Sequence, residues 1–209
     1  MPEGPEVFAL AYALRKYGFN QYHSYGKHLF TGNEDWSFGL NGRVHLLRDG
    51  ILSKISEGYI IGANKPCSSY ENFISLLGMS WINEDTLFND FTIMIETWKT
   101  SKKTLATLIL DQSYISGIGV AWGSEILSMA NLDPSKKACD QCLNCLPTIL
   151  LSLGTTIRKQ YTDYIDHLSK DELYDFINEW FHNLYRVRTM NVYKKGKKIV
   201  VGNRTWYHP

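Results

Sequence analysis

The feature that most limits the fold is a change in the spacing of apolar residues near residue 85. Between residues 18 and 62, short alternating runs are bounded by turn residues such as Gly32-Asn33 and Asp49-Gly50, which is typical of antiparallel hairpins. From Thr86 onward, apolar residues recur every three or four positions, as in helices. The predicted helices span 86–98, 101–111, 119–130, 140–152, 155–166 and 170–184. A β-rich part followed by a helical part predicts an α+β fold.

We expect three consecutive segments along the chain. Residues 1–85 should form a β-rich domain, an antiparallel sandwich with a leading helix that runs to about Lys16. A linker is expected from Gly78 to about Asp85, and residues 86–185 should form a helical domain. Within that domain, Ser169 followed by Glu172 predicts a capping box at the start of the last helix.

The third segment, residues 186–209, is predicted to contain a two-stranded hairpin. Its strands are Lys197–Val200 and Thr205–Tyr207, joined by a Gly202-Asn203 turn. Such a hairpin is marginally stable alone in water, so we expect it to dock on another part of the protein.

Composition indicates the cellular compartment of the protein but does not identify its binding partner. The 209 residues contain no apolar run long enough to cross a bilayer and no signal segment at the start. We therefore expect a cytoplasmic or nuclear protein with reduced cysteines, without membrane contact, and we expect a monomer.

The net charge of +1 argues weakly against a nucleic-acid partner, but the distribution of charge says more. Residues 186–209 contain seven basic and no acidic residues, and such a block can neutralise phosphates. The basic residues are Arg186, Arg188, Lys194, Lys195, Lys197, Lys198 and Arg204. The alternative is a solvated, flexible tail.

The N-terminus, Met1-Pro2-Glu3-Gly4-Pro5-Glu6-Val7, is a candidate nucleophilic site. Removal of Met1 would expose a secondary amine on Pro2, and a free α-amino group has a pKa of about 8. Such an amine can attack a carbonyl-like carbon to form a Schiff base, and the adjacent carboxylate of Glu3 can move protons. The alternative is a helix that begins after a stiff Pro/Gly lead-in, with acidic residues near its positive end.

A second motif is a tight turn with Gly117 and Gly119 between two predicted helices. Glycines at a helix N-terminus expose backbone N–H groups that, together with the helix dipole, can hold a phosphate. The alternative is an ordinary helical hairpin, since glycine turns between helices are common.

The cysteines raise a separate possibility. Cys139, Cys142 and Cys145 form a C-x2-C-x2-C pattern that could ligate an iron–sulfur cluster with a fourth ligand such as Cys67. The alternative is a run of reduced thiols around a helix start. The histidines show no paired ligand spacing and are interpreted as structural or surface residues; they are His23, His28, His45, His167, His182 and His208.

Taken together, the two motifs resemble the formamidopyrimidine-DNA glycosylase/endonuclease VIII family. The resemblance rests on residues 1–7, on the helix–two-turn–helix stretch 110–119 with Ser124–Leu127, and on Asp133-Pro134. Weaker similarities are 26–29 and 39–42, and the terminal hairpin looks like a zincless version of the family's zinc finger. The match spans the whole chain in the right order.

The resemblance implies a base-excision-repair DNA glycosylase with AP lyase activity, acting on damaged double- or single-stranded DNA without cofactor or metal. A flipped-out damaged nucleotide would be attacked at C1′ by Pro2, with Glu3 as acid/base, and β- and δ-elimination would follow. The family's catalytic and DNA-contacting residues match further positions: Lys27 and Arg204 for catalysis, and Glu6, Leu40, Gly117, Gly119 and Asn203 for DNA binding. Lys27 is expected on a strand, and Leu40 as the apolar filler of the emptied stack.

The sequence departs from the family pattern in four ways, and the first two, at Val120 and in the short first domain, favour a second candidate function. Val120 stands where the family has a phosphate-gripping asparagine, and the first domain is short, without a match for the second intercalation loop. Arg204 directly precedes Thr205, one position from the family's arginine, and the terminal hairpin has no cysteine. The alternative is therefore a weak or inactive lesion-binding protein on the same scaffold. A cysteine-ligated redox or metal protein is a third possibility.

Overall fold

A computed structural model of the chain describes residues 3–20, 22–31, 37–39, 44–46, 52–54, 74–180, 183–184 and 190–209. Its contacts group the chain into two compact units. Unit 1 combines Met1–Leu76 with Thr156–Arg188, and unit 2 combines Leu77–Thr155 with Thr189–Pro209. This grouping differs from the three consecutive segments expected from the sequence, because residues 156–188 return to pack with the N-terminal part. The functional roles assigned to 1–85, 86–185 and 186–209 remain predictions.

Unit 1 is organised around helix α1 (Gly4–Tyr17), whose apolar residues Val7, Leu10 and Leu14 are fully buried. Its first turn contains Pro5, which suits a position where no N–H is needed. The helix ends at Gly18, whose φ of 124° lies in the left-handed region. The helix predicted to run to about Lys16 is confirmed.

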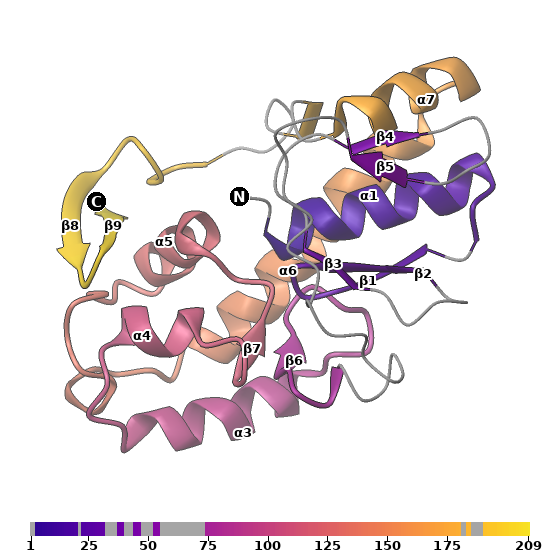
Figure 1. Cartoon of the computed structure of the whole chain (residues 1–209). Coiled ribbons are helices and arrows are strands. Elements are labelled where there is room, and N and C mark those ends of the chain that lie inside the picture. The colour runs from indigo at the N-terminus through magenta and orange to yellow at the C-terminus, as the bar shows by residue number, and fades with distance from the viewer. Residues whose placement is uncertain are drawn as a thin grey trace. The chain divides into compact units, whose positions relative to one another are not determined.

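Two antiparallel sheets accompany α1. Strands β1 (Tyr22–Tyr25), β2 (His28–Thr31) and β3 (Ser37–Gly39) form one sheet in that order, and β4 (Val44–Leu46) pairs with β5 (Leu52–Lys54). Figure 1 shows α1 lying along β1 and β2 on one side and along α7 (Lys170–Asn178) on another. The antiparallel pairs lie where the sequence predicts strands, and their arrangement as a sandwich remains a prediction.

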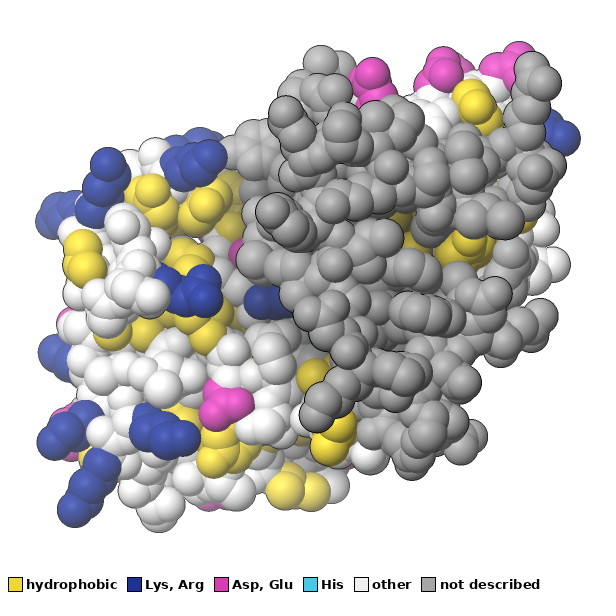
Figure 2. All heavy atoms as spheres, in the orientation of Figure 1, with side chains coloured by type: hydrophobic (Ala, Val, Ile, Leu, Met, Phe, Trp, Pro, Cys, Tyr) yellow, Lys and Arg dark blue, Asp and Glu magenta, His cyan; other side chains and the backbone are white. Residues whose placement is uncertain are grey.

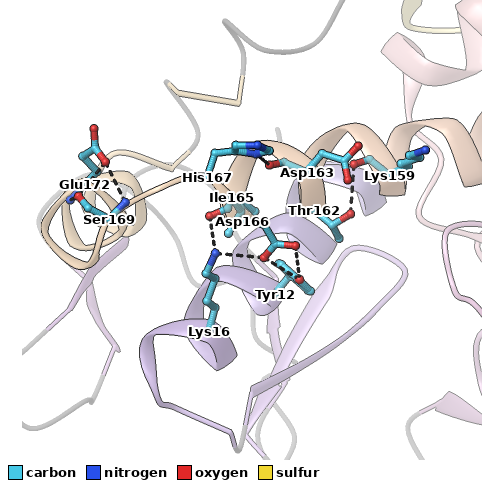
Figure 3. A network of polar contacts seen from close by, with 10 residues as sticks. All are labelled: Tyr12, Lys16, Lys159, Thr162, Asp163, Ile165, Asp166, His167, Ser169 and Glu172. Carbon is cyan, nitrogen blue, oxygen red and sulfur yellow. Dashed lines mark hydrogen bonds and ion pairs between the residues drawn. The ribbon is translucent and has the colours of Figure 1, made fainter.

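The last part of helix α6 (Leu146–Asp166) is fastened to α1 by polar contacts (Figure 3). Lys16 Nζ lies 3.1 Å from Asp166 Oδ1 and donates to the Ile165 carbonyl at 2.9 Å, while the Tyr12 hydroxyl donates to the same carboxylate at 3.0 Å. These hydrogen bonds hold the pKa of Asp166 below its usual range. A segment distant in sequence thus becomes part of the N-terminal unit.

The start of α7 has the capping box predicted from Ser169 and Glu172. Ser169 Oγ accepts the N–H of Glu172 at 3.3 Å, and Glu172 Oε2 accepts the N–H of Ser169 at 2.8 Å. The buried side of α7 consists of Leu173, Phe176 and Ile177. This prediction is confirmed.

The part of unit 2 between residues 77 and 140 is mainly helical and contains two short strands. The elements of this part are β6 (Met79–Ser80), α3 (Phe88–Lys99), α4 (Leu105–Leu110), β7 (Ile115–Ser116), α5 (Val120–Met129) and the 3-10 helix η1 (Ala138–Asp140). The predicted linker from Gly78 to Asp85 is wrong. Strand β6 pairs in parallel with β7. Trp81 and Ile82, which follow β6, are each 1% exposed, and burying two large apolar side chains stabilises the folded protein.

Helix α6 also differs from expectation, since the predicted helices 140–152 and 155–166 are one helix that begins only at Leu146. Gly154, between the two predicted helices, lies inside α6, where a Cβ would come within 2.9 Å of the Trp81 carbonyl oxygen. The glycine therefore allows a close approach of backbone.

The C-terminal strands β8 (Lys197–Val201) and β9 (Arg204–His208) pair antiparallel, with Val201 opposite Arg204. The two residues between them include Gly202, with φ of 63°, as two-residue hairpin turns require. Trp206 is fully buried, and β9 contacts α5. The hairpin lies where the sequence predicts it, and it docks on a helix of unit 2.

Candidate nucleic-acid interface

The start of α1 buries two of the predicted site residues. Glu3 is 6% exposed and Glu6 is 1% exposed, and Glu6 Oε2 accepts the N–H of Glu3 at 2.9 Å. This contact fixes the backbone of Glu3, the residue directly after the proposed nucleophile. Pro2 itself lies outside the described residues, as does Leu40. The roles of both remain predictions.

Lys27 lies in a turn, so its predicted position on a strand is wrong. Tyr25 pairs with His28, which leaves Gly26 and Lys27 as the two connecting residues between β1 and β2. Gly26 has φ of 54°, which an L-residue adopts only at a cost. Lys27 is half-buried, and its catalytic role remains a prediction.

The neighbour of Lys27, His28, is held neutral at physiological pH. Burial, followed by the positive charge of Lys27, lowers the pKa of His28 to about 4. Burial and Arg15 also lower the pKa of His23, although this side chain is exposed. The predicted structural role of His28 fits a half-buried neutral imidazole.

In unit 2, the turn before α5 is braced by Gln112, a residue that the sequence did not single out. Gln112 Oε1 accepts the N–H of Gly117 at 3.0 Å, and its amide group donates to the carbonyls of Leu110 and Ile118. Gly117 has φ of 98°, a backbone conformation that residues with a Cβ rarely adopt, so a glycine is needed at this position. Since its N–H is engaged, a DNA-binding role for Gly117 would act through the shape of the turn.

Gly119 is the N-cap residue of α5, and its carbonyl accepts the N–H of Gly123 at 2.8 Å. Val120 is the first residue of the helix and is half-buried. An apolar side chain at this position cannot donate a hydrogen bond to phosphate. An anion at this position would therefore interact with the helix dipole and with the backbone N–H groups of the first turn.

The terminal hairpin carries exposed cations. Arg204 and Asn203 are exposed at the turn, and Lys195, Lys197 and Lys198 are exposed at the opposite end of the hairpin. Figure 2 shows Lys and Arg side chains across this face of unit 2, whereas Asp and Glu side chains gather on α7. The exposed acidic residues of α7 are Asp171, Glu172, Asp175 and Glu179. Only the first of these two surfaces has the charge to attract DNA.

The predicted site residues therefore fall into two groups. Glu3, Glu6 and Lys27 belong to unit 1, and Gly117, Gly119, Asn203 and Arg204 belong to unit 2. The sequence also missed Glu125, a carboxylate 3% exposed inside α5. Glu125 is the one charged residue in the helical stretch Val120–Met129, and this was the signal that could have marked it.

The cysteine motif shows no metal geometry in the described residues. Cys139, Cys142 and Cys145 are exposed and unbridged, and within the described ranges no three or more His, Cys, Asp or Glu side chains could hold a metal ion. Cys67 lies outside those ranges. In the same part of the chain, every helix is too short or too polar to cross a bilayer.

Comparison of the sequence with protein-family models and with curated proteins finds no match. The structure, in contrast, resembles solved structures over its full length. It matches the MutM (Fpg) protein of Thermus thermophilus with 18% identity and a TM-score of 0.62, covering 100% of this chain and 97% of the other. It matches Fpg of Lactococcus lactis in a complex with THF-DNA and an inhibitor, with 17% identity, a TM-score of 0.60, and 100% and 98% coverage.

A third match is the complex between Lactococcus lactis Fpg and DNA containing an abasic site, with 18% identity and a TM-score of 0.57. It covers 99% of this chain and 97% of the other. At these identities the similarity shows the fold. The mixed helical and small-sheet fold expected from the sequence is therefore confirmed as that of the Fpg structures.

Proposed function

We propose that this protein is a base-excision-repair DNA glycosylase with AP lyase activity on damaged DNA. The observation that carries the proposal is the full-length similarity to Fpg structures bound to abasic-site DNA, in a chain that begins Met1-Pro2-Glu3. As a DNA-repair enzyme it would act in the cytoplasm or nucleus, as a monomer and without a metal.

The proposed chemistry begins at the amine of Pro2 after removal of Met1. Its nitrogen lone pair attacks C1′ of the damaged nucleotide, the glycosidic bond breaks, and the base leaves with a proton supplied by an acid. Ring opening of the sugar gives an iminium ion, which acidifies the neighbouring C2′ proton. Loss of that proton expels the 3′ phosphate, and a second elimination expels the 5′ phosphate.

Glu3 is the candidate acid and base for these proton transfers. Its backbone is fixed by Glu6, and its side chain is buried, so its position is restricted before DNA binds. Lys27, at the β1–β2 turn, would contact a phosphate and assist elimination. Preorganised groups of this kind accelerate proton transfer because they need not reorganise during the reaction.

DNA binding would use elements of unit 2. The Gly117–Gly119 turn with α4 and α5 would act as a helix–two-turn–helix motif, and the β8–β9 hairpin as a zincless finger with Arg204 and Asn203 at its turn. Exposed lysines at the other end of the hairpin would neutralise phosphates and release counterions. Leu40 would fill the space left by the flipped nucleotide.

A second candidate function is binding to lesion-containing DNA without turnover. The observation that favours it is Val120 in the first turn of α5, because its side chain cannot replace the hydrogen bond of an asparagine. A pure binding protein, however, has no need of a terminal proline amine beside a buried glutamate.

The decisive experiment is borohydride trapping on DNA with an abasic site. The processed wild-type protein should form a covalent complex, and Pro2→Ala or a form that retains Met1 should not. Trapping by Pro2→Ala at the wild-type level would show that another amine is the nucleophile. Binding of lesion DNA by the wild-type protein without trapping would support the binding function instead.

Lesion preference is tested with a panel of single- and double-stranded oligonucleotides. The zincless hairpin favours oxidised pyrimidines, as in endonuclease VIII-like proteins. Affinity should fall steeply as salt rises because phosphate contacts release counterions. An affinity independent of salt would contradict DNA as the partner.

A further inference from the structure

The β8–β9 hairpin is held in place by three consecutive residues of α5. A two-stranded hairpin is marginal by itself, so its attachment decides where its turn lies. Gly123, Ser124 and Glu125 each make a different contact with residues 190–208, and all three are buried. Hairpin and helix both belong to unit 2.

Glu125 makes the most extensive of these contacts. Its Oε1 accepts the N–H groups of Val192 and Tyr193, both at 2.7 Å, and its Oε2 accepts the N–H of Asn191 at 3.0 Å. These three residues directly precede the turn that leads into β8. A carboxylate that accepts several N–H groups forms charge-assisted bonds, which are about twice as strong as neutral ones. Only an acceptor with two oxygens can satisfy all three donors.

Gly123 and Ser124 hold the other strand. The side chain of Trp206 lies so close to Gly123 that a Cβ there would be 3.0 Å from its Cζ3 atom. Ser124 Oγ accepts the N–H of Tyr207 at 3.2 Å. The fully buried indole and this hydrogen bond fix β9 on the helix, two and three residues after Arg204.

We propose that Glu125 is a positioning residue for the reaction: together with Gly123 and Ser124 it fixes Arg204 relative to the Gly117–Gly119 turn. This inference rests on the proposed function, in which both elements contact the same DNA. The turn lies at the start of α5 and the attachment lies one helical turn further on, so turn and hairpin form one rigid element. Glu125 itself touches no substrate.

The test compares Glu125→Gln with Glu84→Gln, which removes the same charge from an exposed residue of unit 2. The amide keeps the shape of the side chain but has one acceptor oxygen, so at least one backbone N–H loses its partner. Hydrogen exchange of residues 190–208 should accelerate in Glu125→Gln and remain unchanged in Glu84→Gln. Equal exchange in the two variants would overturn the attachment.

The second readout is the rate of borohydride trapping in a double-mutant cycle with Arg204→Ala. Glu125→Gln should slow trapping by about tenfold or more, since a displacement of ~1 Å can cost on the order of 100-fold. In the Arg204→Ala background, the same change should have little further effect. An equal loss in both backgrounds would show that Glu125 acts only through stability and would overturn the positioning role.

Two further variants keep the test decisive. Ser124→Ala removes a single hydroxyl and should give a smaller loss with the same dependence on Arg204, even if Glu125→Gln folds poorly. Glu125→Asp keeps the carboxylate and should restore part of the trapping rate. If the wild-type protein does not trap at all, the proposed function fails and the positioning role fails with it, whereas the exchange experiment still decides the attachment.

Discussion

Glu6 and Glu125 are both buried carboxylates that accept backbone N–H groups, but they act over very different distances along the chain. Glu6 accepts from Glu3, three residues earlier, at the start of the same helix. Glu125 accepts from three residues that follow it by 66 to 68 positions. The first contact shapes the beginning of one element, and the second fixes where another element lies.

This difference separates two kinds of interaction in the molecule. Local contacts, such as those of Glu6, Gly18 and the Ser169–Glu172 pair, specify where an element begins or ends. Long-range contacts, such as those of Glu125 and Gly78, specify which elements lie together. The long-range residues should therefore be the less tolerant of substitution.

The largest effect is expected at Gly78. A Cβ there would come within 2.2 Å of the Tyr114 carbonyl group, and the N–H of Gly78 donates to the Gln112 carbonyl at 2.7 Å. Gly78→Ala should therefore separate β6 from β7 and cost more than about 3 kcal/mol. The control is Gly202→Ala, in open space with φ of 63°, which should cost about 1 kcal/mol through local strain. Urea unfolding measures the loss of stability in both variants. Equal losses would contradict the idea that long-range contacts tolerate substitution less than local ones.

The next effect is a pH dependence caused by His28. Its pKa in the folded protein is about 4, whereas the unfolded value is about 6.5. Between these values the unfolded state binds more protons, so stability is full above about pH 6.5 and falls as the pH drops toward about 4. The loss over this range should be about 3 kcal/mol.

Unfolding free energies measured across this pH range for wild type and His28→Gln test the assignment. The variant should lose less stability on acidification than wild type, because the group that titrates has been removed. His167→Gln is the control, since His167 is exposed. An unchanged pH slope in His28→Gln would show that another group is responsible.

The two carboxylates themselves give a direct comparison. Glu6→Gln keeps an acceptor for the N–H of Glu3, as glutamine does in capping boxes, and should cost less than about 1 kcal/mol of stability. Glu125→Gln leaves at least one backbone N–H without a partner and should cost about 2 kcal/mol. Urea unfolding of the two isosteric variants measures the difference, and a larger cost for Glu6→Gln would reverse the interpretation.

The smallest effect is expected from Ser169→Ala at the start of α7. The variant loses the hydroxyl that accepts the N–H of Glu172, which should cost about 1 kcal/mol. The pKa of Glu172, now lowered mainly by the hydrogen bond from Ser169, should rise toward its ordinary value. NMR titration of the Glu172 carboxyl group measures this change, and an unaltered pKa would show that the hydrogen bond from Ser169 is not its cause.

The sequence predicted where most helices and strands lie along the chain, but fewer of the segments that they pack against. It indicated the first helix, the strands near residues 22–54, the capping box of α7 and the terminal hairpin. It was wrong for the linker at 78–85 and for the separation of helices 140–152 and 155–166, because the partners of Trp81 and Gly154 lie far away in sequence. Among the candidate site residues, Glu3 and Glu6 are buried together at a helix start, whereas Lys27 lies in a turn and not on a strand.

By itself, the sequence determined the type and ends of the elements, because caps, turn glycines and apolar spacing act over three or four residues. It also carried the motifs that suggested the fold now confirmed by the Fpg structures. Only the tertiary structure decided that residues 156–188 join the N-terminal unit, that Gln112 braces the glycine turn, and that Glu125 holds the hairpin. Such choices depend on burying donors, acceptors and apolar surface between distant segments, and short-range patterns do not encode them.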